Sequence, residues 1–158
     1  MEALENSIHT AVAPSQQQEV FQFSIFLDGK EWTSSRVIKL LSTQGIIILA
    51  FSFVENYDCA VMRIVVNYPE LVEKTLTTAM VHYLKTPVIA IEMEHVFDLQ
   101  KLSNALFSAE VKVHYMYPFL ARPNNKVAVI IQSEQNPFLP QLIHGIGMSI
   151  LSQNDIGR

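Results

Sequence analysis

Apolar and polar residues alternate from residue 20 onward. Within residues 20–27, Phe21 and Phe23 fall on one side of an extended chain, and Gln22 and Ser24 fall on the other. A period of two residues is typical of a β-strand, because successive side chains point to opposite faces. The pattern therefore predicts that the ordered part of the chain opens with a strand.

A helical spacing follows this strand. Val37, Leu40 and Leu41 stand at i, i+3 and i+4, which places them on one face of a helix. Gly45 comes just after them, where a helix end favours a residue that tolerates positive φ. Residues 46–54 are then almost wholly apolar and rich in β-branched and aromatic types. Such a run predicts a strand whose two faces are both covered.

The remainder of the first half is predicted as a turn, a strand and a helix. The turn covers residues 55–58, the strand covers 59–67, and the helix begins at Pro69, a residue that the first helical turn accepts. Residues 81–85 are open to two interpretations, a fourth strand or a linker, because Pro87 follows at once. The first half thus reads β-α-β-β-α.

The same order returns in the second half, and an internal repeat is the first organisation to test. With a shift of about 65 residues, three apolar pairs coincide, namely Leu41 with Leu106, Ile46 with Val111, and Ile48 with Val113. The predicted elements are a strand at 87–93, a helix opened by Asp98, strands at 110–119 and 126–133, a short helix after Pro137, and a last strand at 148–153.

Two such repeats predict an α+β fold made of two ferredoxin-like βαββαβ units, each an antiparallel sheet with helices on one face. We divide the chain into a flexible N-terminal tail (1–19), a first unit (20–86) and a second unit (87–158). A unit of about 65 residues buries barely enough surface to fold alone. Because the strands are apolar on both sides, we expect further association through the sheet.

Composition narrows the class of protein. Hydrophobic residues make up 49% of the chain and charged residues 16%, which excludes global disorder. The net charge of -4 argues against nucleic acid or an anionic membrane as the main partner. The longest apolar run is about half of the roughly 20 residues that a membrane-spanning helix needs. Cys59, the single cysteine, suits a reducing compartment, and residues 1–18 show no signal-peptide pattern, so we expect a cytoplasmic protein.

Motifs for catalysis or cofactor binding are missing from the sequence. The five histidines show no metal-ligand spacing, and we find no nucleophile motif, phosphate loop or zinc signature. The same fold occurs in acylphosphatases, but those need an arginine in the loop after the first strand, and residues 28–32 have none. RNA-recognition domains stack bases on aromatic strand residues, which 59–67 and 126–133 lack. We therefore predict no catalytic residue, no metal and no cofactor.

Three segments resemble tandem ACT-domain proteins. They are LLSTQGIIILAFSF at 40–53, RIVV at 63–66 followed by Pro69, and LSNALFSAEVKVHYMYPF at 102–119. The resemblance covers about residues 20–154 and depends on the repeat and its order more than on any single motif. It implies a non-catalytic regulatory protein that binds a small metabolite, with an amino acid as the expected ligand. The strands that are apolar on both sides predict that the protein assembles as a homo-oligomer, a dimer.

The resemblance also implies where a ligand would bind. In this family the loop after the first strand and the start of the first helix face the second strand of a neighbouring unit. The corresponding residues here are Asp28, Gly29, Lys30, Trp32, Gly45 and Ile46. Gly29 would let backbone N–H groups approach a ligand carboxylate. Asp28 would pair with an ammonium group, and Trp32 would form an apolar wall.

Other interpretations of these residues remain open. Asp28–Gly29 is also the pattern of a simple tight turn, and the family's usual Asp-x-Pro-Gly loop contains a proline that this loop lacks. The corresponding loop of the second repeat, residues 94–98, has neither proline nor glycine, and Lys112 replaces the usual asparagine of the second strand. The alternative function is therefore a ligand-free oligomerisation or protein-interaction module with the same fold.

Overall fold

The computed structural model describes residues 19–122 and 126–157. The predicted tail at residues 1–19 therefore lies outside the described residues, except for Glu19. The first half of the chain contains β1 (Val20–Leu27), α1 (Ser34–Thr43), β2 (Ile48–Glu55), β3 (Ala60–Val66) and α2 (Pro69–Thr78). The second half contains β4 (Tyr83–Met93), α3 (Asp98–Ser108), β5 (Val113–Pro118), β6 (Val127–Ser133), α4 (Leu139–Gly145), β7 (Ser149–Leu151) and α5 (Gln153–Ile156).

The strands form one antiparallel sheet that runs through both halves. Its order is β2-β3-β1-β4-β6-β5, with β7 paired to β4. The strands β4-β1-β3-β2 and β7-β4-β6-β5 each follow the order of a ferredoxin-like unit. The predicted α+β fold of two such units is therefore confirmed, and the two units share a strand.

β4 is the shared strand. Its residues 83–88 pair with β1, and its residues 89–93 pair with β6, with β7 opposite positions 90–92. Of the residues 81–85 that were left open between strand and linker, 83–85 thus belong to a strand that crosses the predicted boundary between residues 86 and 87. We retain the division of the chain into two units at this point as a proposal.

Pro87 stands in the middle of β4 without breaking it. Its carbonyl oxygen accepts a hydrogen bond from the side-chain amide of Asn136, with an N···O distance of 3.3 Å. In an antiparallel strand the N and C=O of one residue point to the same edge, so the missing N–H of Pro87 faces Asn136 and not β1. The ladder between β4 and β1 therefore loses no hydrogen bond at Pro87.

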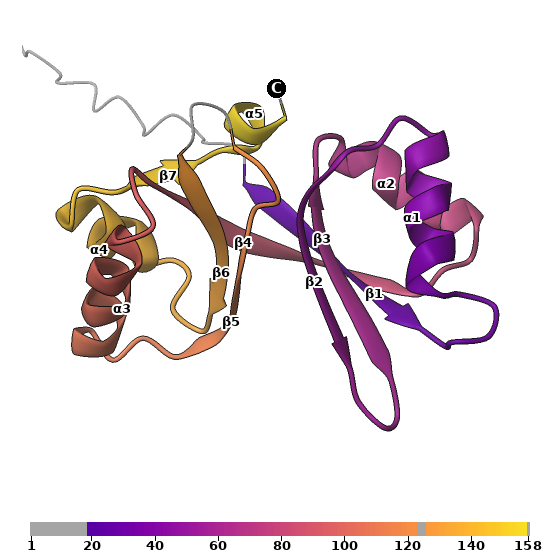
Figure 1. Ribbon diagram of the computed structural model, residues 1–158, viewed down its shortest axis with the longest axis horizontal. Coiled ribbons are helices and arrows are strands. Elements are labelled where there is room, and N and C mark those ends of the chain that lie inside the picture. Colours follow the sequence, from indigo (N-terminus) through magenta and orange to yellow (C-terminus); the bar gives the residue numbers. More distant parts are fainter. Residues whose placement is uncertain (1–18, 123–125, 158) are drawn as a thin grey trace, which may run out of the picture.

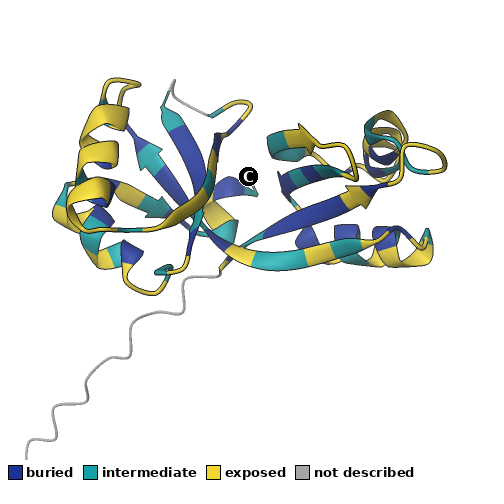
Figure 2. Ribbon diagram, turned by 90° about the horizontal axis from the view of Figure 1, so that it is seen from below, coloured by how far each residue is buried: buried dark blue, intermediate teal, exposed yellow. Residues whose placement is uncertain are grey.

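Helices cover the outer face of the sheet (Figure 1). α1 and α2 pack on the first half around residues such as Phe23, Leu41 and Leu76, and α3 and α4 pack on the second half around Leu102 and Ile143. Figure 2 shows the buried faces directed inward and exposed residues along the outside of the helices. Each half thus has its own hydrophobic core between sheet and helices.

A third core lies between the two halves. The sheet curls so that β2 approaches β5, where Ala50 and Phe119 form an antiparallel bridge. The backbone N–H of Leu120 donates to the carbonyl of Leu49 at 2.8 Å. The helix-free faces of both halves therefore cover each other. The association through the sheet that the sequence predicts takes place within one chain.

The short helix α5, which the sequence analysis does not predict, packs against this third core. Ile156 is 2% exposed and belongs to the core between the halves. Gln153 donates from its side-chain amide to the carbonyl of Val66 at 2.9 Å, which joins α5 to the end of β3. One end of the core between the halves is thereby covered. Within the described residues, no helix is both long and apolar enough to cross a membrane.

Candidate functional site

The loop between β1 and α1 is held together by Asp28. Its Oδ1 accepts the backbone N–H of Lys30 at 2.9 Å and that of Trp32 at 2.8 Å. Gly29 has φ +70°, and its N–H donates to the carbonyl of Trp32 at 3.3 Å. The hydrogen bond from Trp32, and after it the one from Lys30, lower the pKa of the Asp28 carboxyl group. The loop is thus a tight turn whose glycine takes a left-handed conformation.

A positively charged side chain accompanies this loop. Arg36, in the first turn of α1, places its guanidinium carbon 5.5 Å from the centre of the Trp32 ring and donates to the carbonyl of Glu31. Thr33 caps the helix by accepting the N–H of Arg36 at 3.3 Å. The helix start and Arg36 together suit an anionic group. Arg36 is not among the site residues predicted from the sequence, although its position in the first helical turn is readable there.

Gly45 and Ile46 lie at the opposite end of α1. The helix has 10 residues, which corresponds to a length of about 15 Å. Within one chain the structure therefore brings Asp28, Gly29, Lys30 and Trp32 together, but it does not bring Gly45 and Ile46 to them. A site containing all six residues needs the α1–β2 joint of a neighbouring unit beside the loop.

Gly45 and Ile46 also have a structural role as a helix cap. Gly45 has φ +73°, and the N–H of Ile46 donates to the carbonyl of Leu41 at 3.1 Å. This is the bond pattern of a Schellman motif. α2, α3 and α4 end in the same way, with positive φ at Met80, Glu110 and Gly147 and bonds from Val81 to Leu76, Val111 to Leu106, and Met148 to Ile143. The repeat detected in the sequence is thus visible in the backbone.

Residues 94–98, the loop of the second repeat that corresponds to the β1–α1 loop, border a polar cavity of ≈ 370 Å³. Asp98 holds this loop by accepting the N–H of His95 at 3.0 Å. Glu92, also in the lining, accepts from Arg122 at 2.6 Å and from Lys126 at 3.4 Å. The negative charge of Glu92 in the cavity wall is therefore partly neutralised by Arg122 and Lys126, which lie in the connection between β5 and β6. None of the six residues predicted from the first repeat lines this cavity.

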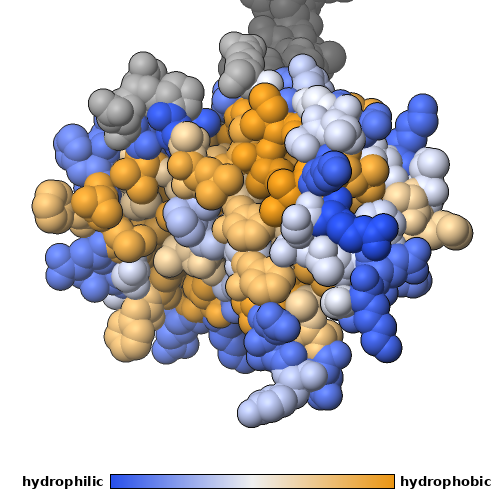
Figure 3. Space-filling model, turned by 45° about the vertical axis from the view of Figure 1, so that its right-hand side comes forward, coloured by the Kyte–Doolittle hydropathy of each residue, from blue (hydrophilic) through white to orange (hydrophobic). Residues whose placement is uncertain are grey.

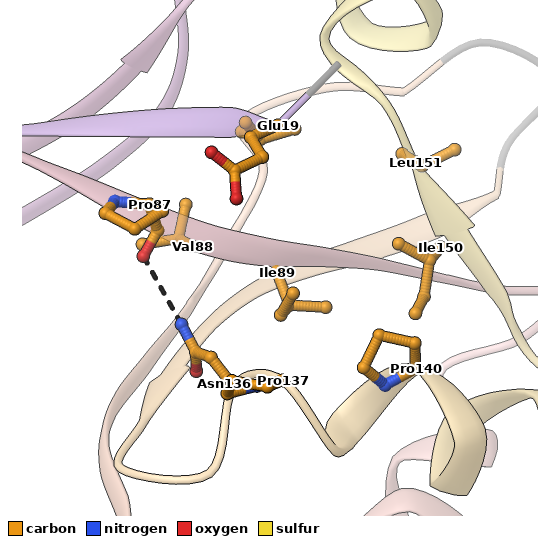
Figure 4. A pocket seen from close by; sticks show the side chains of 10 residues that line it. Glu19, Pro87, Val88, Ile89, Asn136, Pro137, Pro140, Ile150 and Leu151 are labelled. Carbon is orange, nitrogen blue, oxygen red and sulfur yellow. Dashed lines mark hydrogen bonds between the residues drawn. The ribbon is translucent and has the colours of Figure 1, made fainter. Parts of the chain in front are cut away.

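A second cavity, of ≈ 360 Å³, lies where β4 passes from one half to the other (Figure 4). Its walls are mainly apolar and include Ile89 and Ile150. The carboxylate of Glu19 extends from the start of β1 toward the part of the cavity formed by Pro87 and Asn136 (Figure 4). An apolar wall with one carboxylate suits a small, mostly apolar molecule. The six predicted residues do not line this cavity either.

The rest of the described surface gives no sign of a metal centre. The described residues contain no group of three or more histidine, cysteine, aspartate or glutamate side chains placed to hold a metal ion. In Figure 3, apolar side chains gather near the middle of the face, and many hydrophilic ones lie toward its edges. The candidate sites described above offer a ligand hydrogen-bonding groups, charges and apolar walls.

Comparison with known proteins identifies the family. The model of the ACT domain pair matches residues 18–138, and this chain belongs to that family. The resemblance to tandem ACT proteins is thereby confirmed. A search of curated proteins finds no match.

Solved structures share the fold. Protein BT0572 from Bacteroides thetaiotaomicron is 25% identical, with 89% of this chain and 97% of that chain covered and a TM-score of 0.79. The ligand-free regulatory subunit of aspartate kinase from Thermus thermophilus is 14% identical, with 84% and 95% covered and a TM-score of 0.57. The corresponding subunit from Thermus flavus is also 14% identical, with 82% and 93% covered and a TM-score of 0.55.

Proposed function

We propose that this ACT domain pair is a non-catalytic regulatory protein that binds a small metabolite, with an amino acid as its ligand. Membership of the family supports the regulatory role. Two proteins with the same fold are regulatory subunits of aspartate kinase, which agrees with it. The observation that carries the proposal is the β1–α1 loop, where an aspartate, a left-handed glycine and a helix start lie together.

The loop offers a partner for each end of an amino acid. The start of α1, with Lys30 and Arg36 nearby, would receive the carboxylate. Oδ1 of Asp28 is already occupied by the loop's own N–H groups, so its Oδ2 would receive the ammonium. The lowered pKa extends the pH range in which Asp28 is ionised further into the acid side. Trp32 would form the apolar wall.

A second copy of the chain would complete this site. Gly45 and Ile46 are separated from the loop by the length of α1, so they would reach it only from a neighbouring unit. We therefore propose a homodimer in which ligand occupancy changes the arrangement of the two copies. Such coupling requires that the ligand bind the two arrangements with different affinity.

A thermal-shift screen with the proteinogenic amino acids tests the binding. A ligand that binds only the folded state, present at ten times its Kd, stabilises it by about 1.4 kcal/mol. We expect one amino acid or a small group of them to raise the melting temperature, and Asp28→Asn to abolish the response. Asp58→Asn, in the exposed β2–β3 turn, is the matched control. The absence of any shift at millimolar concentrations would contradict the proposal.

The alternative is a ligand-free interaction module. Large apolar side chains are exposed around α3 and α4, including Phe97 at 86%, Phe107 at 86% and Phe138 at 71%. Such residues on an outer surface suit contact with another protein. Mass measurement in solution, with and without amino acids, separates the two functions. An oligomer that does not respond to any amino acid would favour the alternative.

We also propose that the protein acts in the cytoplasm and that neither nucleic acid nor a membrane is its partner. The single cysteine, Cys59, is exposed and unpaired, as is usual in a reducing compartment. The net charge of -4 would repel polyanionic surfaces. Fractionation of cells that express the tagged full-length chain tests the location.

A further inference from the structure

Arg63, on β3, has no acidic partner among the described residues. Its side chain takes part in no hydrogen bond or ion pair within the described part of the chain, and its Nε is buried without an acceptor. Its guanidinium carbon lies 4.3 Å from the centre of the Tyr115 ring. This cation–π contact occupies no hydrogen-bond acceptor, so the guanidinium can still donate to a carboxylate.

Hydroxyl groups flank this arginine on the sheet. The strand register places Ser24 of β1 and Ser52 of β2 directly opposite Arg63 on its two sides. Opposite residues in an antiparallel sheet lie on the same face, with their Cβ atoms about 5 Å apart. The face is the inner one, since Val65, two residues along β3, belongs to the core between the halves. Arg63 is therefore the centre of a polar row inside the curled sheet.

Gln22 sets the direction of the neighbouring hydrogen bonds. Its side-chain amide donates to Ser24 Oγ at 3.0 Å and to Tyr115 Oη at 2.8 Å, and its Oε1 accepts from the Tyr117 hydroxyl at 2.7 Å. Because the oxygens of Ser24 and Tyr115 accept from Gln22, their own hydrogens remain available for donation. The hydroxyl groups of Ser24 and Tyr115 are thus two donors close to a guanidinium that has no acid partner.

Apolar residues surround this polar row at the open end of the inner face. Phe26 is 45% exposed, Val54 44% and Leu84 57%. Leu84 is opposite Ser24 on β4, and Phe26 and Val54 are two residues beyond Ser24 and Ser52. α5 packs against the other end of the core between the halves. A ligand of Arg63 would therefore approach it from the apolar end.

We propose that Arg63 is the anchor of a second binding site, which takes a small apolar monocarboxylate without an ammonium group. The inner-face positions of β1, β2, β3 and the first half of β4 hold no aspartate or glutamate. An α-amino acid would therefore bury its ammonium there without a partner, which is costly. This site is distinct from the β1–α1 loop and does not depend on the proposed amino-acid site.

Three molecules with nearly the same carbon skeleton test the site by calorimetry on the full chain carrying Asp28→Asn, so that binding of leucine at the β1–α1 loop does not contribute. 4-Methylpentanoate carries the carboxylate, leucine adds an ammonium, and 4-methylpentan-1-ol replaces the carboxylate by a hydroxyl. We expect 4-methylpentanoate to bind at least about tenfold more tightly than either analogue. Binding of leucine or the alcohol with equal affinity would overturn the proposal, as would a lack of binding by all three.

Substitution assigns the binding to Arg63. Arg63→Gln should lower the affinity for 4-methylpentanoate at least about tenfold, because a charge-assisted bidentate contact is lost. Lys74→Gln, an exposed position on α2, removes the same charge far from the inner face and should leave the affinity unchanged. Nuclear Overhauser contacts between the ligand methyl groups and Phe26 or Leu84 in the unaltered chain provide a readout that does not depend on how the variant folds. Equal loss in both variants, or contacts to other residues only, would overturn the assignment.

Discussion

Tyr117 shows how one hydroxyl group can hold the two halves together. It lies on β5, and its hydroxyl donates to Gln22 on β1 across the core between the halves, at 2.7 Å. Burial is the main cause that raises the pKa of Tyr117, so the group stays protonated and can donate at any physiological pH. The contact joins residues 95 positions apart in the sequence. Sequence periodicity placed Tyr117 on a strand but could not identify its partner.

We predict that Tyr117→Phe destabilises the protein by about 1–3 kcal/mol, because Oε1 of the fully buried Gln22 loses its donor. Urea unfolding measures the change. Tyr57→Phe is the matched control, because Tyr57 is fully exposed and should change the free energy of unfolding by less than about 0.5 kcal/mol. Equal effects of the two substitutions would show that the hydrogen bond to Gln22 contributes nothing.

The charge of Asp28 should make stability depend on pH. The folded state lowers the pKa of Asp28 below its ordinary value of 3.8. A group with a lowered folded pKa contributes stability above the unfolded pKa, and this contribution is lost as the pH falls through the folded pKa. Urea unfolding from neutral to strongly acidic pH should therefore show a smaller acid-induced loss for Asp28→Asn than for the unaltered chain. The control Asp58→Asn should retain the full loss.

At the scale of elements, the four main helices end alike although their sequences do not. Gly45 and Gly147 are suited to positive φ, but Met80 and Glu110 adopt φ of 57° and 53° at equivalent positions. In the sequence Gly45 predicts a helix end, whereas Glu110 carries no comparable signal. The repeated bond to the carbonyl five residues back, and not the residue type, defines the cap.

Opposite substitutions at two of these caps give a paired prediction. Glu110→Gly should stabilise the protein by about 0.5–1 kcal/mol, because glycine removes the strain of a left-handed residue at some entropic cost. Gly45→Ala should destabilise it by about 0.5–1 kcal/mol, because alanine is strained in the left-handed conformation. A Cβ at Gly45 would meet no atom within 4 Å, so only this backbone strain is added. Thermal unfolding of both variants checks the signs. Changes in the same direction would contradict the shared cap.

β4 marks the limit of what local pattern could predict about the elements. Pro87 separates two apolar runs, and the sequence analysis therefore placed a boundary beside it. In the structure Pro87 lies inside one continuous strand, because its missing N–H faces the side chain of Asn136. That partner is 49 residues away, so no local rule could foresee it. The individual strands and helices of each repeat, by contrast, were readable from spacing alone.

At the scale of the whole molecule, the curled sheet makes the two halves interdependent. The sequence predicted strands with two apolar faces, but the curl that covers the second face depends on long-range pairing such as the bridge between Ala50 and Phe119. The candidate site shows the same limit. Asp28, Gly29, Lys30 and Trp32 adjoin one another because they are sequential, whereas the neighbours of Arg63 come from strands distant in the sequence.

Interdependence predicts a single unfolding transition for the whole chain. Trp32 is the only tryptophan and belongs to the first half, so its fluorescence reports on that half.

Leu102 is fully buried in the second half, and Leu102→Ala should lower the free energy of unfolding by about 2–5 kcal/mol. Because the halves share β4 and the core between them, Leu102→Ala should shift the Trp32 fluorescence midpoint in urea as far as it shifts the far-ultraviolet dichroism midpoint. Leu99 lies on the same helix and is 37% exposed, so Leu99→Ala should shift both midpoints much less. A Trp32 midpoint unmoved by Leu102→Ala would mean that the first half unfolds independently, and the shared strand would then not couple the two units.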